Sequence, residues 1–497
     1  MTSGLLIAGT SSDAGKSLVV TGLCRALVRR GLDVAPYKAQ NMSNNSGVCA
    51  DGAEIGRAQL LQAAAARLEP TSAMNPVLLK PGTDRRAHVV VRGRPGGTLE
   101  AGQYATGRRH LAEAAWAAYE ELGAEHDLVV CEGAGSPAEI NLRSGDYVNL
   151  GLARRFDLPV VVVGDIDRGG VLASLYGTVA LLEPEDRALV HAFVINKFRG
   201  DPDVLTPGLE EITRRTGVPF AGVLPWLDGV WLDAEDSLEV GAWLRSSSTG
   251  PGLLRVAVVR FPRVSNATDV EALAAEPGVE VRVTTDPAVV AGADLAVLPG
   301  TRATLSDLAW LRRTGLADAV LDRARREAPV LGICGGYQAL GQRVEDPDAV
   351  ESATASTVDG LGLLPVTTRF HADKSLGRPI GTWRGHAVRA YEIHHGRATA
   401  THPSTGSGRV EEFLDGWRVG STWGTVWHGA LENDGFRRAW LAEVAAASGS
   451  SWTPAVDAPA FGARRETMID TLADAVEEHL DLDLLLARTR VGAGARA

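Results

Sequence analysis

Cysteine is scarce in this chain of 497 residues, which has four in all: Cys24, Cys49, Cys131 and Cys334. Their spacing matches no metal-binding motif, and such sparse use fits a reducing cytoplasm better than a disulfide framework. Long apolar runs are missing too, because none approaches the about 18 residues that a membrane span needs. No signal peptide precedes the first predicted strand. We therefore expect a cytoplasmic protein with no membrane partner.

An excess of basic residues is also missing. Lys and Arg number 50 against 61 Asp and Glu, which gives a net charge of −11 at pH 7. Because binding to a nucleic-acid backbone needs a basic face, we expect no nucleic acid as the main partner. A local basic pocket for an anionic small molecule remains open. The chain is too long for one core, so we expect two or three domains, while no feature indicates an oligomeric state.

Strand-like and helix-like patterns alternate through the first half of the chain. This alternation predicts an α/β fold with a mostly parallel sheet covered by helices. A helix is expected from about Lys16 to Arg30. Buried strands are expected at Gly4–Gly9, Asp127–Cys131, Pro159–Val163 and Val190–Ile195.

The second half predicts another α/β domain. A linker with the composition RSSSTGPG separates it from the first, so the predicted ranges are 1–244, 245–252 and 253–446. The tail, 447–497, carries apolar residues at helical spacing over Arg465–Arg490 and predicts one helix. That helix either caps the second domain or mediates self-association. Further strands are expected at Leu253–Val259, Val279–Thr284, Leu295–Pro299 and Pro329–Ile333.

A phosphate-binding loop is predicted at Gly9–Ser17, which reads GTSSDAGKS between a strand and a helix. Backbone N–H groups of such a loop, with the helix N-terminus, form a positive concavity for phosphates. Lys16 would reach the terminal phosphates of ATP, and the Ser17 hydroxyl would bind Mg²⁺. Thr10 stands where the usual motif has its first glycine, and with Gly15 it completes the predicted ATP site. This variant resembles the dethiobiotin synthetase type of loop.

Acidic residues follow the next two strands. Glu132 begins EGAGS after the strand DLVVC, and the carboxyl end of a strand beside a phosphate loop predicts a Mg²⁺ ligand together with Ser17. A salt bridge or a helix cap is the alternative for Glu132. Asp165 and Asp167 in GDIDRGG stand at the same kind of position and suit either the metal, the substrate or a turn. The amide-rich segment Lys38–Ser46 suits a ligand or a turn equally.

Cys334 lies within LGICGGYQALG, after the apolar strand Ala328–Ile333 and before a helix-like stretch. A nucleophile between a strand and a helix occupies a tight, exposed corner, where side chains on the next residues would clash. Two glycines directly after the sulfur therefore favour a nucleophile over a cysteine that only fills the core. We predict that Cys334 is catalytic.

A cysteine nucleophile needs a base and an oxyanion hole. His428 in GTVWHG is the favoured base because it lies between an apparent strand and a glycine turn. His394 and His395 in YEIHHG are the alternatives. The backbone N–H groups of Gly300, in LPGTR, and Gly335 are the predicted oxyanion hole.

These strings resemble the class I glutamine amidotransferases, which release ammonia from glutamine through a cysteine thioester. Many of those enzymes carry a glutamate two residues after the histidine, where this chain has Ala430. Longer strings narrow the resemblance to the cobyric acid synthase family, in which, by resemblance, Cys and His suffice. They are KAQNMSNNS, DGAEIGRAQ, MNPVLLKP, EGAGSPAEINL, DIDRGG, INKFRGD, LGICGGYQALG, YEIHHG and GTVWHGALENDGFR.

This resemblance covers roughly residues 4–446. It implies ATP- and glutamine-dependent amidation of the b, d, e and g carboxylates of adenosylcobyrinic acid a,c-diamide, in cobalamin biosynthesis. Val426 and Trp427 depart from the more usual tyrosine–leucine pair. Basic residues in the motifs would hold the polyanionic corrinoid, although each taken alone also suits a surface charge. They are Arg57, Lys80, Arg168, Lys197 and Arg199.

Three other functions stay open at this point. A cobyrinic acid a,c-diamide synthase has the same layout, and the resemblance predicts acidic residues near Asn41–Asn45 in that case. A nucleotide-dependent switch of the partitioning-ATPase type shares the phosphate loop, but has no use for Cys334 and His428. A cell-wall amidotransferase partner usually splits the two activities between chains.

Overall fold

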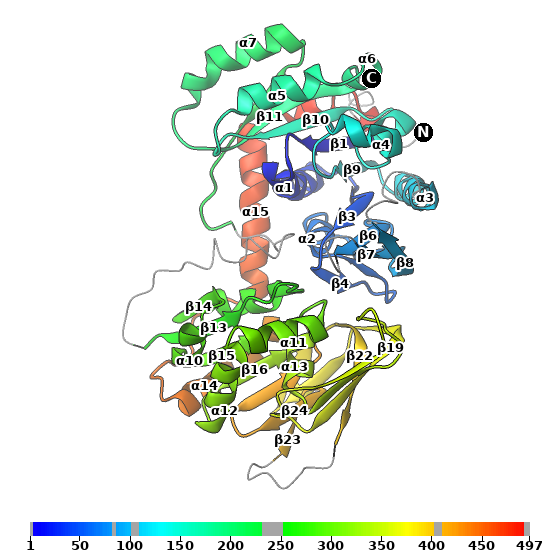
Figure 1. Cartoon of the computed structure of the whole chain (residues 1–497). Coiled ribbons are helices and arrows are strands. Elements are labelled where there is room, and N and C mark those ends of the chain that lie inside the picture. Colours follow the sequence, from blue (N-terminus) through cyan, green and yellow to red (C-terminus); the bar gives the residue numbers. More distant parts are fainter. Residues whose placement is uncertain (1–2, 82–85, 101–108, 231–251, 402–409, 492–497) are drawn as a thin grey trace. The chain divides into compact units, whose positions relative to one another are not determined.

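The computed structural model of the chain describes residues 3–81, 86–100, 109–230, 252–401 and 410–491. The chain forms two compact units, which we describe separately (Figure 1). The predicted linker, 245–252, lies outside the described residues except for Gly252. The first unit comprises Met1–Ser43, Cys49–Asp233 and Arg465–Ala497, and the second comprises Asn44–Val48 and Ala234–Arg464.

A six-stranded sheet in the order β12-β11-β10-β1-β9-β2 forms the centre of the first unit. All of its neighbouring strands pair in parallel, which confirms the predicted sheet. The strands read as continuous apolar runs because both faces of a parallel sheet are covered. They are β1 (Gly4–Gly9), β2 (Val34–Tyr37), β9 (Leu128–Glu132), β10 (Val160–Asp165), β11 (Val190–Phe198) and β12 (Phe220–Pro225).

Helices cover both faces of this sheet. Leu5 and Ile7 of β1 join a core that includes residues of α1 and the C-terminal helices, whereas Leu6 and Ala8 join a core with residues of α3, α4 and α5. This division follows from the alternation of side chains along a strand. The helices are α1 (Lys16–Arg29), α2 (Arg57–Ala65), α3 (Arg109–Glu125), α4 (Leu150–Phe156), α5 (Val171–Ala180), α6 (Pro184–Arg187) and α7 (Thr206–Thr216).

A smaller sheet in the order β3-β6-β7-β8 also belongs to the first unit. It begins directly after β2 and carries part of the amide-rich segment. Its strands are β3 (Gln40–Met42), β6 (Val77–Pro81), β7 (Arg86–Val91) and β8 (Arg94–Glu100). The strands β4 (Ser46–Val48) and β5 (Glu54–Gly56) lie between β3 and α2 in the chain.

In the described part of the tail, α15 (Phe461–His479) is followed by a separate helix, α16 (Leu482–Leu486), so the prediction of a single helix is wrong. The break arises because Leu480 forms a bridge with Gly222, and the Asp481 N–H donates to the Ala221 carbonyl at 2.7 Å. The residues of the tail from Arg465 on group with the first unit, a placement that sequence analysis did not anticipate.

Helix α15 packs closely along α1. A Cβ on Gly22 would lie 2.7 Å from the backbone oxygen of Leu472, so only glycine permits this approach. Arg25, which is 1% exposed, binds Asp470 at 2.7 Å and Glu466 at 2.9 Å. A buried guanidinium needs such partners, and they fix the tail on the helix that follows the phosphate loop.

The second unit contains a seven-stranded sheet in the order β14-β13-β15-β16-β25-β24-β23. Pairing is parallel from β14 to β25 and antiparallel beyond it, which confirms a second α/β domain. Its strands are β13 (Leu254–Val259), β14 (Val279–Thr284), β15 (Leu295–Leu298), β16 (Val330–Ile333), β23 (Val410–Phe413), β24 (Gly416–Val419) and β25 (Thr422–Thr425).

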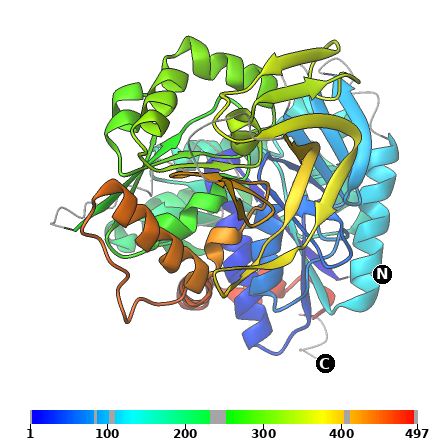
Figure 2. The same ribbon diagram turned by 90° about the horizontal axis from the view of Figure 1, so that it is seen from below.

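Helices and an arm of mixed parallel and antiparallel strands complete the second unit. The helices are α9 (Glu271–Ala274), α10 (Pro287–Gly292), α11 (Thr304–Arg313), α12 (Leu316–Arg325), α13 (Gly335–Leu340) and α14 (Asp434–Ser448). The arm, in which β19 and β22 lie side by side (Figure 2, yellow-green and yellow), has the order β18-β17-β19-β22 beside a β20–β21 hairpin. Its strands are β17 (Arg343–Asp346), β18 (Ser356–Asp359), β19 (Val366–Gly377), β20 (Ile380–Trp383), β21 (His386–Arg389) and β22 (Glu392–Ala400).

The second unit also holds a short segment from the N-terminal sequence, Asn44–Val48. The Ser46 N–H donates to Asn266 Oδ1 at 2.9 Å, and Asn45 Oδ1 accepts from the Ala267 N–H at 3.3 Å. Val48 packs with buried side chains at the start of β22. Across the described ranges of the chain, no helix has the length and apolarity that crossing a membrane requires.

Candidate active sites

The predicted phosphate loop lies where three parallel strands end. Strand β1 pairs with β9 on one side and β10 on the other. Because carboxyl ends of parallel strands share one sheet edge, Glu132 at the end of β9 and Asp165 at the end of β10 flank the loop after β1. This edge is where α/β sheets bind ligands.

The loop itself is closed by Lys16. Its Nζ donates to the backbone oxygens of Ser11 at 2.9 Å, Ser12 at 3.1 Å and Gly135 at 3.3 Å, so the ammonium lies across the loop. Gly15 has φ +90°, and a Cβ there would lie 2.1 Å from Asn196 Nδ2. The Thr10 N–H donates to the Val163 carbonyl at 2.9 Å.

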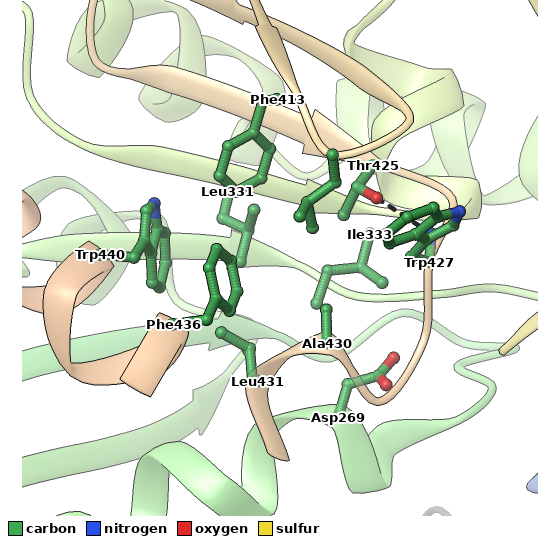
Figure 3. A pocket seen from close by; sticks show the side chains of 11 residues that line it. Asp269, Leu331, Ile333, Phe413, Thr425, Trp427, Ala430, Leu431, Phe436 and Trp440 are labelled. Atoms are coloured by element: carbon green, nitrogen blue, oxygen red, sulfur yellow. Dashed lines mark hydrogen bonds between the residues drawn. The ribbon is translucent and has the colours of Figure 1, made fainter. Parts of the chain in front are cut away.

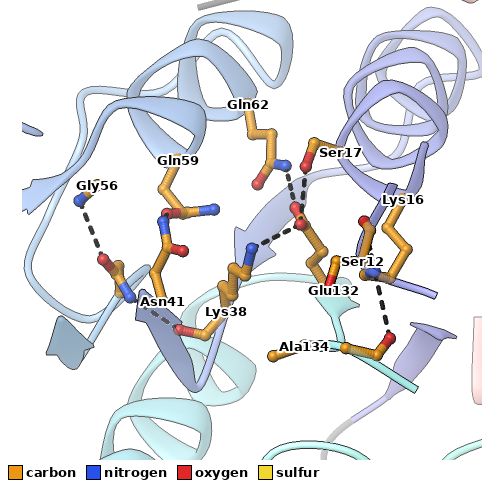
Figure 4. Close-up of polar contacts among 12 residues, drawn as sticks. Ser12, Lys16, Ser17, Lys38, Asn41, Gly56, Gln59, Gln62, Glu132 and Ala134 are labelled. Atoms are coloured by element: carbon orange, nitrogen blue, oxygen red, sulfur yellow. Dashed lines mark hydrogen bonds and ion pairs between the residues drawn. The ribbon is translucent and has the colours of Figure 1, made fainter. Parts of the chain in front are cut away.

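Glu132 is the centre of a buried polar network (Figure 4). Its carboxylate, in a side chain 1% exposed, accepts from Ser17 Oγ at 2.8 Å, Lys38 Nζ at 2.8 Å and Gln62 Nε2 at 2.5 Å. Burial alone raises the pKa of the Glu132 carboxyl, but the Lys38 ammonium and the hydrogen bonds outweigh burial and hold that pKa below its ordinary value. The network therefore keeps a charged carboxylate beside the phosphate loop.

Sequence analysis named Glu132 and Ser17 but missed Lys38 and Gln62 as their partners. Of the two alternatives for Glu132, the structure contains the salt bridge, to Lys38. Lys38 begins the amide-rich segment KAQNMSNNS, which directly follows β2, and β2 pairs with β9. This position was the sequence feature that could have indicated a contact between Lys38 and Glu132. Metal binding by Glu132 stays a prediction.

Three of the five predicted substrate residues lie at the phosphate-loop edge of the sheet, each paired with an aspartate. Arg168 binds Asp13 at 2.7 Å, and Lys197 Nζ donates to Asp165 at 2.8 Å and to the Asp13 carbonyl at 2.8 Å. Arg199 pairs with Asp167, and its guanidinium lies 3.7 Å from the ring centre of Trp226.

The other two predicted substrate residues lie around β5 and β6. Lys80 binds Glu54 at 2.5 Å, and both side chains are almost fully buried. Arg57 begins α2 and is 7% exposed. Buried cations of this kind are costly without partners, so these two side chains are held in place rather than solvated.

In the second unit, Cys334 joins β16 directly to α13. Its φ of +49° is strained for a residue with a side chain, and its N–H donates to the Thr425 carbonyl at 2.8 Å. The predicted tight corner is present, but the expectation that it is exposed is wrong. Cys334 is only 6% exposed because β22 covers the sulfur, with Sγ 4.0 Å from the Ile393 oxygen.

The glycines after Cys334 permit a close backbone approach. A Cβ on Gly336 would lie 2.0 Å from the Leu298 oxygen at the end of β15, and one on Gly335 would lie 2.6 Å from Thr301 Cγ2. The turn that contains Gly300 is thereby held against the start of α13. A Cβ on Gly300 would lie 3.0 Å from His428 Cε1, so both predicted oxyanion-hole glycines lie beside the Cys–His pair.

His428 is the histidine that faces Cys334. It is 1% exposed, and its ring stacks on Tyr391 with centres 5.3 Å apart. Its Nδ1 lies 2.6 Å from Asp269 Oδ2, which leaves Nε2 for the sulfur. Burial alone lowers the pKa of His428, but interactions with Asp269 and Cys334 outweigh burial and raise that pKa above its usual range.

The alternative histidines are held elsewhere. His394 Nδ1 lies 2.8 Å from the Gly396 oxygen, and its Nε2 lies 3.4 Å from a Glu392 carboxylate oxygen. His395 Nδ1 lies 3.1 Å from the His371 oxygen. Geometry therefore favours His428 as the partner of Cys334.

Asp269 is the residue at this site that sequence analysis missed. It lies 159 positions before His428, so no local spacing connects the two. The sequence feature that could have indicated Asp269 was the polar loop after the first parallel strand of the domain. Loops at this end of a parallel strand reach the ligand-binding edge of the sheet.

Two family models match the chain. The model of the CobQ/CobB/MinD/ParA nucleotide binding domain matches residues 5–240, and that of the CobB/CobQ-like glutamine amidotransferase domain matches residues 255–436. Together they correspond to the two α/β sheets described above.

Curated relatives match along nearly the whole length. The cobyric acid synthase of Cutibacterium acnes is 64% identical over 98% of this chain and 100% of its own length. The cobyric acid synthase of Mycolicibacterium vanbaalenii is 58% identical over 97% of this chain and 96% of its own length. That of Streptomyces coelicolor is 55% identical over 99% of this chain and 97% of its own length. The chain belongs to the cobyric acid synthase family.

Proposed function

We propose that this chain amidates the b, d, e and g carboxylates of adenosylcobyrinic acid a,c-diamide, with ATP and glutamine as co-substrates. It is a glutamine-dependent amidating ligase that acts in cobyric acid synthesis, as its relatives and its amidotransferase domain show. The observation that carries the finer proposal is that one chain contains both a phosphate loop with a charged carboxylate and a buried Cys–His pair.

The first half of the reaction activates a carboxylate. Ammonia does not displace hydroxide from a carboxylate, because hydroxide is a poor leaving group. Transfer of the γ-phosphoryl group of ATP to a carboxylate oxygen gives an acyl phosphate, which ammonia attacks with loss of phosphate. Lys16, now bonded to loop carbonyls, would move its ammonium onto the transferring phosphoryl group, while loop N–H groups hold the other phosphates.

Ser17 and Glu132 fit a role in binding Mg²⁺. The Ser17 hydroxyl donates its proton to Glu132, so its oxygen lone pairs can face a cation that prefers oxygen ligands. Glu132 already accepts from Lys38 and Gln62, so we assign direct ligation to Ser17 and its orientation to Glu132. A bound Mg²⁺ would neutralise charge on the phosphates.

The second half of the reaction produces ammonia. Cys334 passes its proton to His428, and the sulfur attacks the carboxamide carbon of glutamine. N–H groups of Gly300 and Gly335 would stabilise the oxyanion. His428 then protonates the departing nitrogen, and water hydrolyses the thioester to glutamate.

Binding of the corrinoid would use cations of the first unit. The side chains of Arg168 and Arg199 are 68% and 56% exposed, which suits contacts with a polyanionic ligand. Arg57, Lys80 and Lys197 would act from more enclosed positions.

Mass spectrometry of the corrinoid tests the proposal. Purified protein is incubated with adenosylcobyrinic acid a,c-diamide, glutamine, ATP and Mg²⁺, and we expect successive products with one to four added amides. An untouched diamide, together with two amides added to cobyrinic acid, would instead identify an a,c-diamide synthase. ATP hydrolysis without amidation of either substrate would favour the nucleotide switch.

A further inference from the structure

A buried carboxylate contacts His428 on the ring edge opposite the one that faces Cys334. We propose that Asp269 is the third member of the glutaminase triad, a positioning residue that orients the His428 imidazole and stabilises its protonated form. This inference rests on the roles proposed above for Cys334 and His428. In many class I glutamine amidotransferases, by contrast, the third member lies two residues after the histidine, where this chain has Ala430.

Both oxygens of Asp269 act on the histidine segment. Oδ2 lies 2.6 Å from His428 Nδ1, and Oδ1 accepts from the Gly429 N–H at 2.8 Å. The two contacts fix the ring and the turn that follows it. With Nδ1–H donated to Asp269, the neutral ring has its lone pair on Nε2, which is the tautomer that a base toward Cys334 requires.

Local backbone contacts hold Asp269 in place. It lies in the short helix η5 (Ala267–Val270), and its N–H donates to the Asn266 oxygen at 3.0 Å. Asn266 has φ +50°, a conformation that asparagine tolerates better than most residues. Its side chain is held in turn by the Ser46 N–H at 2.9 Å.

Asp269 lies at the edge of a small, mostly apolar cavity of about 10 Å³ (Figure 3), which Leu331, Ile333, Ala430 and Leu431 also line. Asp269 is 3% exposed. A charged carboxylate in such surroundings needs a partner, and the protonated ring of His428 supplies one. Ala430 contributes a methyl group to this cavity, whereas a carboxylate at that position would make the cavity polar.

Formation of the thioester and release of ammonia need no acid or base other than Cys334 and His428. The Cys334 proton moves to His428 Nε2, the sulfur electron pair attacks the carboxamide carbon, and the same proton leaves with ammonia. Asp269 remains ionised throughout and compensates the imidazolium charge. The titratable groups that act on His428 are Asp269 and Cys334, with the Tyr391 ring stacked on one face.

The test compares Asp269→Asn with a matched control, Asp346→Asn. Asp346 is also a buried carboxylate of the second unit, but its oxygens accept from the backbone N–H groups of residues 350–352 and from the Ser352 hydroxyl, away from His428. We expect Asp269→Asn to lower kcat for glutamine hydrolysis by about 10³-fold, because an amide at this position favours the wrong tautomer. The KM for glutamine and ammonia-supported amidation should change little, and the control should retain its kcat.

A second measurement separates positioning from a loss of structure. The rate of Cys334 alkylation by iodoacetamide is followed against pH in the wild type, in Asp269→Asn and in Asp269→Glu. We expect its rise to move to higher pH in Asp269→Asn and to return toward the wild-type profile in Asp269→Glu, which restores the charge. The proposal is overturned if Asp269→Asn keeps kcat within about threefold of the wild type, or if its alkylation profile is unchanged.

Discussion

The two sites use a buried carboxylate at the edge of a parallel sheet in different ways. In the first unit, Glu132 is paired with Lys38 at 2.8 Å. In the second unit, Asp269 is paired with His428 at 2.6 Å. Lysine keeps its proton, whereas in the proposed mechanism the imidazole of His428 takes a proton from Cys334 and passes it to the leaving group. The same pairing therefore gives a fixed electrostatic site for phosphates in one unit and a site for proton transfer in the other.

The largest predicted effect breaks one site and leaves the other intact. Lys16→Ala removes the cation at the phosphate loop, so we expect amidation to fall below detection with either glutamine or ammonium salts. Glutamine hydrolysis without amidation should persist, because Cys334 and His428 belong to the second unit. Corrinoid mass spectra and glutamate release measure the two activities separately. Normal amidation by the variant would remove Lys16 from the ATP site.

Glu132→Gln tests whether the carboxylate of the first unit is a fixed charge. The variant leaves Lys38 buried without its counter-ion, so the free energy of unfolding should fall by about 3–5 kcal/mol in chemical denaturation. The double variant Glu132→Gln/Lys38→Met should recover part of that loss. An unchanged unfolding midpoint in the single variant would contradict the pairing.

The same pair has a pH signature. The pKa of Glu132 is held below its ordinary value, so its stabilisation is present above the unfolded pKa, about 4.3, and is lost as pH falls through the folded pKa. Wild-type protein should therefore lose more stability on acidification below about pH 4 than Glu132→Gln does. Parallel acid-dependent slopes for the two proteins would count against this account.

The smallest predicted effect concerns Asn45 in the segment Asn44–Val48, which belongs to the second unit although the sequence on either side of the segment belongs to the first. Asn45→Ala removes the acceptor for the Ala267 N–H, two residues before Asp269. A lost hydrogen bond of about 1 kcal/mol predicts a fall of about fivefold in glutamine hydrolysis, with ammonia-supported amidation less affected. Asn45→Asp keeps the acceptor oxygen and should retain activity. Equal losses of both activities would show that the contact matters only for general stability.

The first site could be predicted in large part because its parts are contiguous. Gly9–Ser17 folds as one loop, and β1 and α1 have the bounds that the sequence indicates to within a residue. Lys38 and Gln62 were missed because their proximity to Glu132 depends on how β2 and α2 pack, which local patterns do not specify.

The second site could be predicted only where the backbone geometry requires particular residue types in the local sequence. Cys334 was recognisable from the glycines that its corner requires, and Gly300 and His428 from their places after strands. The carboxylate partner was not, since Asp269 meets His428 only once the sheet has formed. Similarly, apolar spacing predicted a helical tail, but the break at Leu480 and Asp481 arises from pairing with β12, which the tail sequence alone does not contain.

The central claim is that one polypeptide makes ammonia at Cys334 and uses it in ATP-dependent amidation. The most direct test is mass spectrometry of the corrinoid after incubation with ATP, Mg²⁺ and glutamine labelled with ¹⁵N in the amide. Wild-type protein should give a product with four labelled amides. Cys334→Ser should give no labelled product, yet should yield the unlabelled tetra-amidated product when ammonium chloride is added. Labelled amides from Cys334→Ser, or an unchanged corrinoid with wild-type protein, would contradict the account.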